Sequence, residues 1–256
     1  MQEEIKELNP LGYKPVGKLL KSLAIPAIIA NLVNALYNVV DQIFIGQGIG
    51  YLGNAATNIA FPITTMCLAI GLTLGIGGAS NFNLELGKGY PEKSKHTAGT
   101  AASTLIIIGI ILCIVVRIFL EPLMIGFGAT DKILEYSIEY TGITSYGIPF
   151  LLFSIGVNPL VRADGNAKYS MIAIVIGAIL NTILDPLFMF VYNWGIAGAA
   201  WATVISQIVS ATLLLIYFPR FKSVKFSLND FIPQLHYLKR IISLGFASFI
   251  YQFSNM

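Results

Sequence analysis

The sequence predicts an all-α membrane protein, a bundle of six transmembrane helices followed by the start of a seventh. Hydrophobic residues make up 55% of the 256 residues and charged residues only 11%, whereas an ordinary soluble domain has about 25% charged residues. Several stretches reach the roughly 20 apolar residues that a membrane-crossing helix needs. The basic residues between these stretches fall almost entirely on alternate connectors, as the two sides of a membrane require.

The apolar stretches define the order of the expected elements. The six complete transmembrane segments are residues 22–46, 57–82, 98–120, 138–163, 169–191 and 198–218. They divide the chain into a polar N-terminal segment (1–21), a six-helix lobe (22–218), a polar linker (219–240) and a truncated seventh helix (241–256). We do not expect a removable signal peptide, because no small-residue cleavage site follows a short apolar core near the N-terminus.

The basic residues predict the topology. Of the 16 Lys and Arg residues, all but Arg117 and Lys132 precede the first span or lie in the even-numbered connectors. The positive-inside rule therefore predicts a multi-pass protein of the cell membrane with a cytoplasmic N-terminus. The net charge of +3 reflects this topology, so we do not expect a nucleic-acid partner.

The first span has a polar face. Five polar residues spaced at i, i+3, i+7, i+10 and i+11 share one side of the helix, namely Asn31, Asn34, Asn38, Asp41 and Gln42. A carboxylate in hydrocarbon costs several kcal/mol, and such residues usually face a bundle interior or a watery cavity. Asp41 is therefore a candidate functional residue. Pro26 in this span and Pro159 in the fourth remove backbone donors and predict helix bends.

A second intramembrane carboxylate lies in the fifth span, where Asn181 and Asp185 share a helix face at i, i+4. At 1.5 Å per residue, Asp41 and Asp185 lie roughly 28 and 24 Å from the cytoplasmic ends of their helices, so they can share one cavity in the outer half. Thr203 in the sixth span is expected at a similar depth. Asn158 is expected closer to the cytoplasm.

Other motifs have structural interpretations or exclude enzyme chemistry. The spacing of Gly71, Gly75 and Ala79 predicts close helix packing in the second span. The two cysteines and two histidines lack metal-ligand spacing. The chain has no HExxH, GxSxG or P-loop motif. We therefore predict neither an enzyme nor a cofactor.

The start of the seventh helix resembles the start of the first. With an offset of 221 residues, the identical pairs are Ser22/Ser243, Leu23/Leu244, Ile29/Ile250 and Asn34/Asn255, and Asn31 aligns with Gln252. Both segments run outward from the cytoplasm, so the pattern indicates parallel repeats. The chain then comprises one lobe and the opening of a second.

Four motifs together resemble the N-terminal lobe of the MATE (multidrug and toxic compound extrusion) transporters. They are residues 26–46, residues 158–165, the pair Asn181 and Asp185, and residues 195–203 (GIAGAAWAT). The resemblance implies a twelve-helix, two-lobe antiporter that exports cationic or amphipathic drugs in exchange for H⁺ or Na⁺, with a C-terminal lobe of the same protein as its missing partner. It also implies a proton or Na⁺ site at Asp41, Asn158, Asn181, Asp185 and Thr203.

The expected ligands are small organic cations, with Asn34, Tyr37 and Asn38 lining the substrate path. Tyr37 can stack on a flat cation, although the asparagines can equally bridge helices. A flippase or exporter of a lipid-linked or other amphipathic substrate is the alternative function. No basic residue falls in the interior of the first, second, fourth, fifth or sixth span, and Arg117 is near the end of the third, which favours cations. One lobe alone is expected not to transport, because alternating access needs two lobes in the bilayer.

Overall fold

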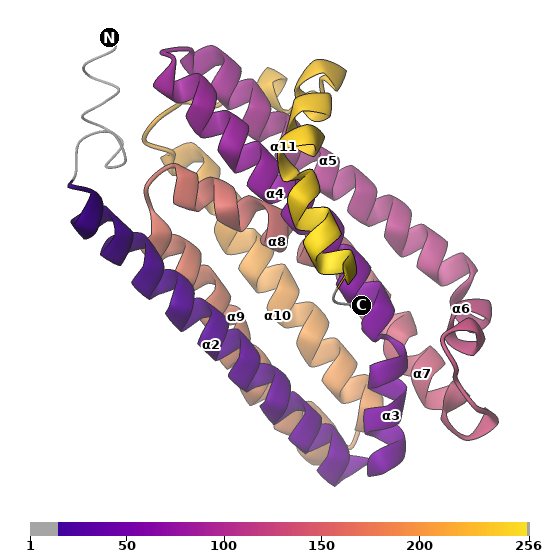
Figure 1. Cartoon of the computed structure of the whole chain (residues 1–256). Helices are drawn as coiled ribbons and strands as arrows, with labels where there is room; N and C mark the ends of the chain where they lie inside the picture. Colours follow the sequence, from indigo (N-terminus) through magenta and orange to yellow (C-terminus); the bar gives the residue numbers. More distant parts are fainter. Residues whose placement is uncertain (1–14, 255–256) are drawn as a thin grey trace.

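The computed structural model describes residues 15–254, which form a bundle of long helices (Figure 1). The bundle contains α2 (Val16–Gly48), α3 (Tyr51–Ile59), α4 (Phe61–Gly87), α5 (Pro91–Ile118), α6 (Leu120–Gly126), α7 (Asp131–Thr144), α8 (Ile148–Ala163), α9 (Ala167–Pro186) and α10 (Gly195–Tyr217). Within the described range no strand is present. Six helical segments are long and apolar enough to cross a membrane, as the sequence predicts.

The helices extend beyond the apolar stretches that predicted them. α2 begins at Val16, so residues 16–21 of the expected polar segment continue the helix, while residues 1–14 lie outside the described range. The expected connector 47–56 includes the first part of α3. Hydropathy locates the part of a helix that lies in hydrocarbon, whereas the backbone hydrogen bonds continue into the polar turns on either side.

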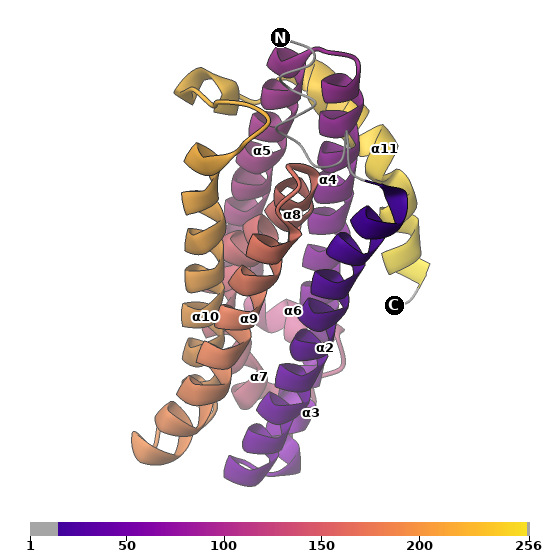
Figure 2. The same cartoon turned by 90° about the vertical axis from the view of Figure 1, so that its left-hand side faces the viewer.

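The bundle has two sides. α2 packs against α9 along one side, and α4 packs against α5 and α11 (Leu235–Ser254) along the other (Figure 1, Figure 2). α8 contacts α4, α5, α9 and α10, so it joins the two sides. α11 starts six residues before the predicted start of the seventh helix at residue 241.

Glycines let the helix backbones approach closely on the α4 side. A Cβ atom added to Gly75 would lie 2.7 Å from the Cα of Gly156 on α8. A Cβ atom on Gly77 would meet the carbonyl oxygen of Ile241, and one on Gly245 would meet that of Thr73. Close packing is therefore the role of the glycine-rich run, as its spacing predicts.

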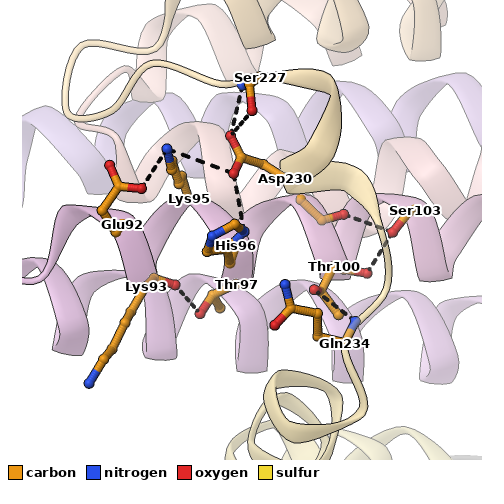
Figure 3. A network of polar contacts seen from close by, with 11 residues as sticks. Glu92, Lys93, Lys95, His96, Thr97, Thr100, Ser103, Ser227, Asp230 and Gln234 are labelled. Carbon is orange, nitrogen blue, oxygen red and sulfur yellow. Dashed lines mark hydrogen bonds and ion pairs between the residues drawn. The ribbon is translucent and has the colours of Figure 1, made fainter.

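The segment between α10 and α11 lies across α5 and is held by the buried carboxylate of Asp230 (Figure 3). This segment contains the short turns η4 (Phe218–Arg220) and η5 (Leu228–Phe231). The backbone N–H of Ser227 donates to Asp230 at 2.7 Å. His96 and Lys95 of α5 place side-chain nitrogens 3.1 and 3.8 Å from the same carboxylate.

Two further carboxylates attach the linker and α11 to the bundle. Asp164, in the turn between α8 and α9, accepts a hydrogen bond from the Tyr217 hydroxyl at 2.8 Å. It also accepts from the backbone N–H groups of Lys222 and Ser223, at 3.0 and 2.9 Å. Glu85, at the end of α4, pairs with Arg240 of α11 at 3.2 Å. The polar linker is thus packed on the bundle rather than free of it.

Candidate functional site

The two intramembrane carboxyl groups meet where α2 packs against α9. Asp41 is 7% exposed and Asp185 is fully buried. The two side chains lie close enough for a hydrogen bond between them when one is protonated. Neither carboxyl group faces outward, and both lie in the half of the bundle away from the linker, as their depths along the sequence predict.

Side-chain amides contact each carboxyl group. Asn181 Nδ2 donates to Asp185 Oδ1 at 3.2 Å and to Thr203 Oγ1 of α10 at 3.4 Å. Gln42 Nε2 lies 3.4 Å from Asp41 Oδ2. These contacts are longer than the usual 2.9 Å of a strong hydrogen bond. They therefore hold the carboxyl groups in place without fully pairing them.

The site has more acceptors than donors. Within the described part of the chain, three of its buried oxygens have no hydrogen-bond partner, namely Asp41 Oδ1, Asp185 Oδ2 and Asn181 Oδ1. Two neighbouring carboxylates also repel each other, which disfavours ionisation of both. A shared proton relieves the repulsion, and a hard cation that prefers oxygen ligands relieves it while using the unpaired oxygens. The geometry fits both H⁺ and Na⁺, the two coupling ions between which the sequence does not decide.

The structure adds residues that the sequence analysis did not identify. Tyr140 of α7 lies near both carboxyl groups, and its hydroxyl is within hydrogen-bonding reach of Thr203. Thr57 of α3 donates to Gln42 Oε1 at 3.2 Å and supports the amide beside Asp41. Neither residue has a regular spacing with the polar residues of α2 or α9, because each comes from a different helix.

Asn158, the fifth predicted coupling residue, lies apart from the other four. Its Oδ1 atom accepts hydrogen bonds from Ser170 Oγ at 2.7 Å and from Nε of Arg162 at 2.9 Å, and it also contacts Nη2 of Arg162. Ser170 and Asp185 are fifteen residues apart on α9, or roughly 22 Å along the helix axis. The structure thus groups Asp41, Asn181, Asp185 and Thr203, and places Asn158 toward the linker end.

A cavity of about 350 Å³ lies between the two sides of the bundle. Its walls contain the predicted residues Asn34, Tyr37, Asn158, Asn181 and Thr203, together with apolar residues of α4 and α8. Asn38 does not line this cavity and instead faces a separate groove with Gln42 and Asn54. The repeat-related residues Asn31 and Gln252 both line the cavity, although they come from opposite ends of the chain.

One basic side chain reaches the cavity from the end of its span, which the absence of basic residues from the span interiors did not predict. Arg162 lines the cavity. It lies in the last turn of α8, which continues to Ala163. Because Arg162 follows Asn158 by four residues, the two side chains share a helix face. Its sequence position, among the basic residues of an even-numbered connector, gives no indication of this placement.

Both predicted bend positions are internal to continuous helices. Pro26 is buried within α2, and Pro159 lies within α8 directly after Asn158. Each proline removes one backbone donor. Their bending roles stay predictions.

Comparisons with known proteins agree with the motifs. A sequence model of the MatE family matches residues 26–187, more than half of the chain. The multidrug export protein MepA of Staphylococcus haemolyticus is 25% identical over 240 residues, which cover 92% of this chain and 52% of the relative. MepA of Staphylococcus aureus is 26% identical over 247 residues, which cover 96% of this chain and 54% of the relative. The chain thus spans about half the length of these relatives.

Solved structures give the same result. An outward-facing multidrug resistance MATE family transporter of the MOP superfamily superimposes with a TM-score of 0.86 at 29% identity, covering 99% of this chain and 55% of that one. A MOP superfamily transporter from Pyrococcus furiosus gives 0.85 at 30% identity, covering 93% and 53%. The resemblance drawn from the motifs is confirmed, and the chain belongs to the MatE family of multi-pass membrane transporters, which are not enzymes.

Proposed function

We propose that this chain forms the N-terminal lobe of a two-lobe exporter of cationic or amphipathic compounds, driven by inward movement of H⁺ or Na⁺. The observation that carries the proposal is the pair of buried, incompletely partnered carboxyl groups beside a cavity. The names of the MepA relatives, multidrug export proteins, support the direction and class of transport.

In this proposal Asp41 and Asp185 bind the coupling ion, and the oxygens of Asn181 and Thr203 complete its surroundings. Ionised, the two carboxylates repel each other across the contact between α2 and α9. A bound proton or Na⁺ neutralises this repulsion. Since Asn181 and Thr203 also line the cavity, ion occupancy and cavity shape involve the same residues.

The cavity walls support an amphipathic ligand. Leu68, Leu72 and Ile155 provide an apolar surface, while Asn34 and Asn181 provide amide groups. Tyr37 adds an aromatic ring that can stack on a planar cation. In the proposed two-lobe protein this surface faces the second lobe, and rocking of one lobe against the other opens it to each side of the membrane in turn. We further propose the plasma membrane as its location, with the linker end of the bundle in the cytoplasm.

The alternative, a flippase of a lipid-linked anionic substrate, gains one supporting observation, because Arg162 lines the cavity. A pyrophosphate carries several negative charges, however, and its recognition usually uses a group of basic residues. Among the described residues Arg162 is the single basic side chain in the cavity wall. Export of compounds with fewer negative charges fits this wall better.

The test uses the two-lobe protein reconstituted in lipid vesicles. Ethidium transport is measured under an imposed pH gradient and, separately, under an imposed Na⁺ gradient. We expect transport with at least one gradient, and the effective gradient identifies the coupling ion. Vesicles with the 256-residue chain alone are the matched control and are expected to be inactive. Failure of both gradients to drive transport by correctly folded two-lobe protein would contradict the proposal.

A further inference from the structure

The cavity wall contains a positively charged side chain, Arg162, that has no role in the proposed export of cationic compounds. Arg162 lies at the linker end of the cavity, in the last turn of α8. Asn158 Oδ1 and Ser170 Oγ accept hydrogen bonds from its Nε atom at 2.9 and 3.1 Å. The guanidinium is therefore held against the α8–α9 contact by neighbouring side chains rather than free in solvent.

Arg162 lacks an anionic partner in the described part of the chain. No carboxylate there lies within 4.0 Å of its guanidinium. The nearby Asp164 instead binds Tyr217 and the linker backbone. Its protein partners are the neutral Asn158 and Ser170, which leave its positive charge uncompensated. A half-buried charge is ordinarily paired, because its removal from water is otherwise unfavourable.

The Arg162 guanidinium can bind an additional acceptor. Its hydrogen bonds to Asn158 and Ser170 use Nε and Nη2, which leaves the donors of Nη1 without a protein acceptor among residues 15–254. Arginine presents a planar set of donors that matches the oxygens of a carboxylate or phosphate. Among the described residues that line the cavity, none is acidic and able to compete for it.

We propose that Arg162 forms an anion-recognition subsite at the linker end of the cavity, which binds the anionic oxygen group of an amphipathic ligand whose apolar body lies against Leu68, Leu72 and Ile155. The inference rests on the proposed function, because it names a substrate class for the same cavity. Compounds with both a cationic ring system and a carboxylate are then better ligands than their esters. The same chemistry also fits an anionic lipid headgroup, so the experiment separates the two sources.

The test compares two fluorescent dyes that share one planar cationic ring system. Rhodamine 110 has a free carboxylate, and rhodamine 123 is its methyl ester. Their binding to the 256-residue chain in phosphatidylcholine nanodiscs is measured by fluorescence anisotropy. We expect the acid to bind about tenfold more tightly than the ester, the ratio expected from one charge-assisted hydrogen-bonded pair.

Substitutions assign the preference to Arg162. We expect Arg162→Gln to remove the preference for the acid without changing the affinity for the ester, and Arg162→Lys to retain part of it. Lys168→Gln is the matched control, because Lys168 has the same charge at the same end of the bundle but is exposed and does not line the cavity. Thermal unfolding of each variant checks that it is folded. The comparison of the two dyes on the unsubstituted chain tests the proposal even if a variant fails to fold.

Three results would overturn the proposal: equal affinities of the two dyes for the unsubstituted chain, a preference that survives in folded Arg162→Gln, or a preference that Lys168→Gln removes equally. Repeating the dye-binding measurement in nanodiscs that contain phosphatidylglycerol tests whether an anionic lipid headgroup occupies the subsite. Competition by this lipid that disappears in Arg162→Gln supports the anion subsite with a lipid headgroup as its occupant. Failure of the proposed function itself is recognised separately, as absence of gradient-driven ethidium transport by the two-lobe protein.

Discussion

The buried carboxyl groups of this chain fall into two sets with different surroundings. At the linker end, Glu85, Asp164 and Asp230 each contact a cation or hydrogen-bond donors from another segment. In the opposite half, Asp41 and Asp185 contact each other and amides, and each keeps one oxygen without a donor. Both sets are buried, so burial alone does not distinguish structure from function.

The two sets differ in whether all their carboxylate oxygens have hydrogen-bond donors. The buried polar groups of a folded protein are nearly always hydrogen-bonded, and exceptions need an explanation. The three linker-end carboxylates have such partners and attach the linker and α11 to the bundle. The pair at Asp41 and Asp185 instead keeps oxygens without a hydrogen-bond donor, and in the proposed function these oxygens bind the coupling ion. The same Asp→Asn substitution should therefore have opposite effects in the two regions.

The largest expected effect is on transport at the carboxyl pair. Asp185→Asn or Asp41→Asn in the two-lobe protein should reduce ion-driven ethidium export to background, because an amide neither releases a proton nor neutralises Na⁺. Folding should be unaffected or improved, since the substitution removes repulsion between neighbouring carboxylates. Export is measured in cells and normalised to the amount of protein in the membrane.

The matched control for these variants is Asp131→Asn, which changes an exposed aspartate at the start of α7. It should leave export unchanged. Wild-type export by either Asp185→Asn or Asp41→Asn at normal expression would contradict a role of the carboxyl pair in transport. The pair would then be a structural contact.

The sequence predicted the fold and the matching depth of the two carboxyl groups because both depend on regularities within single helices. The i, i+4 spacing of Asn181 and Asp185 and the distance of Asp41 from its helix start indicated that these residues can share one cavity. Contacts between distant segments have no such regularity. Tyr140 reaches Thr203 from a helix 63 residues earlier in the chain. Nothing in its spacing indicates this contact.

Helix ends explain the remaining differences. Arg162 was counted with the basic residues of the connector after the fourth span, yet its side chain lines the cavity from the last turn of α8. The local sequence around Asp164 gives no indication of its partners. Its partners Tyr217 and Ser223 are more than 50 residues away, so only the folded chain identifies it as the point that holds the linker.

A smaller effect, on stability, is expected at the linker end. Asp164→Asn should lower the free energy of unfolding by about 2 kcal/mol, because an amide cannot accept from all three donors that the carboxylate satisfies. The measurement is thermal unfolding of the chain in detergent, compared with Asp131→Asn. Unfolding at the wild-type temperature would contradict a structural role for Asp164. If Asp164→Asn is destabilised and Asp185→Asn is not, the two buried carboxyl groups have different roles, and only Asp164 stabilises the fold.

The smallest expected effect is at Glu85, whose partners Lys88 and Arg240 remain 49% and 43% exposed. Water and salt screen such pairs, so each contributes about 0.2–1 kcal/mol. Glu85→Gln should therefore lower stability by less than Asp164→Asn does. A double-mutant cycle with Arg240→Gln isolates the contact between α4 and α11, and its coupling energy should fall in the same range. A coupling energy above that range would mean that this ion pair, rather than the close glycine packing beside it, holds α11 on α4.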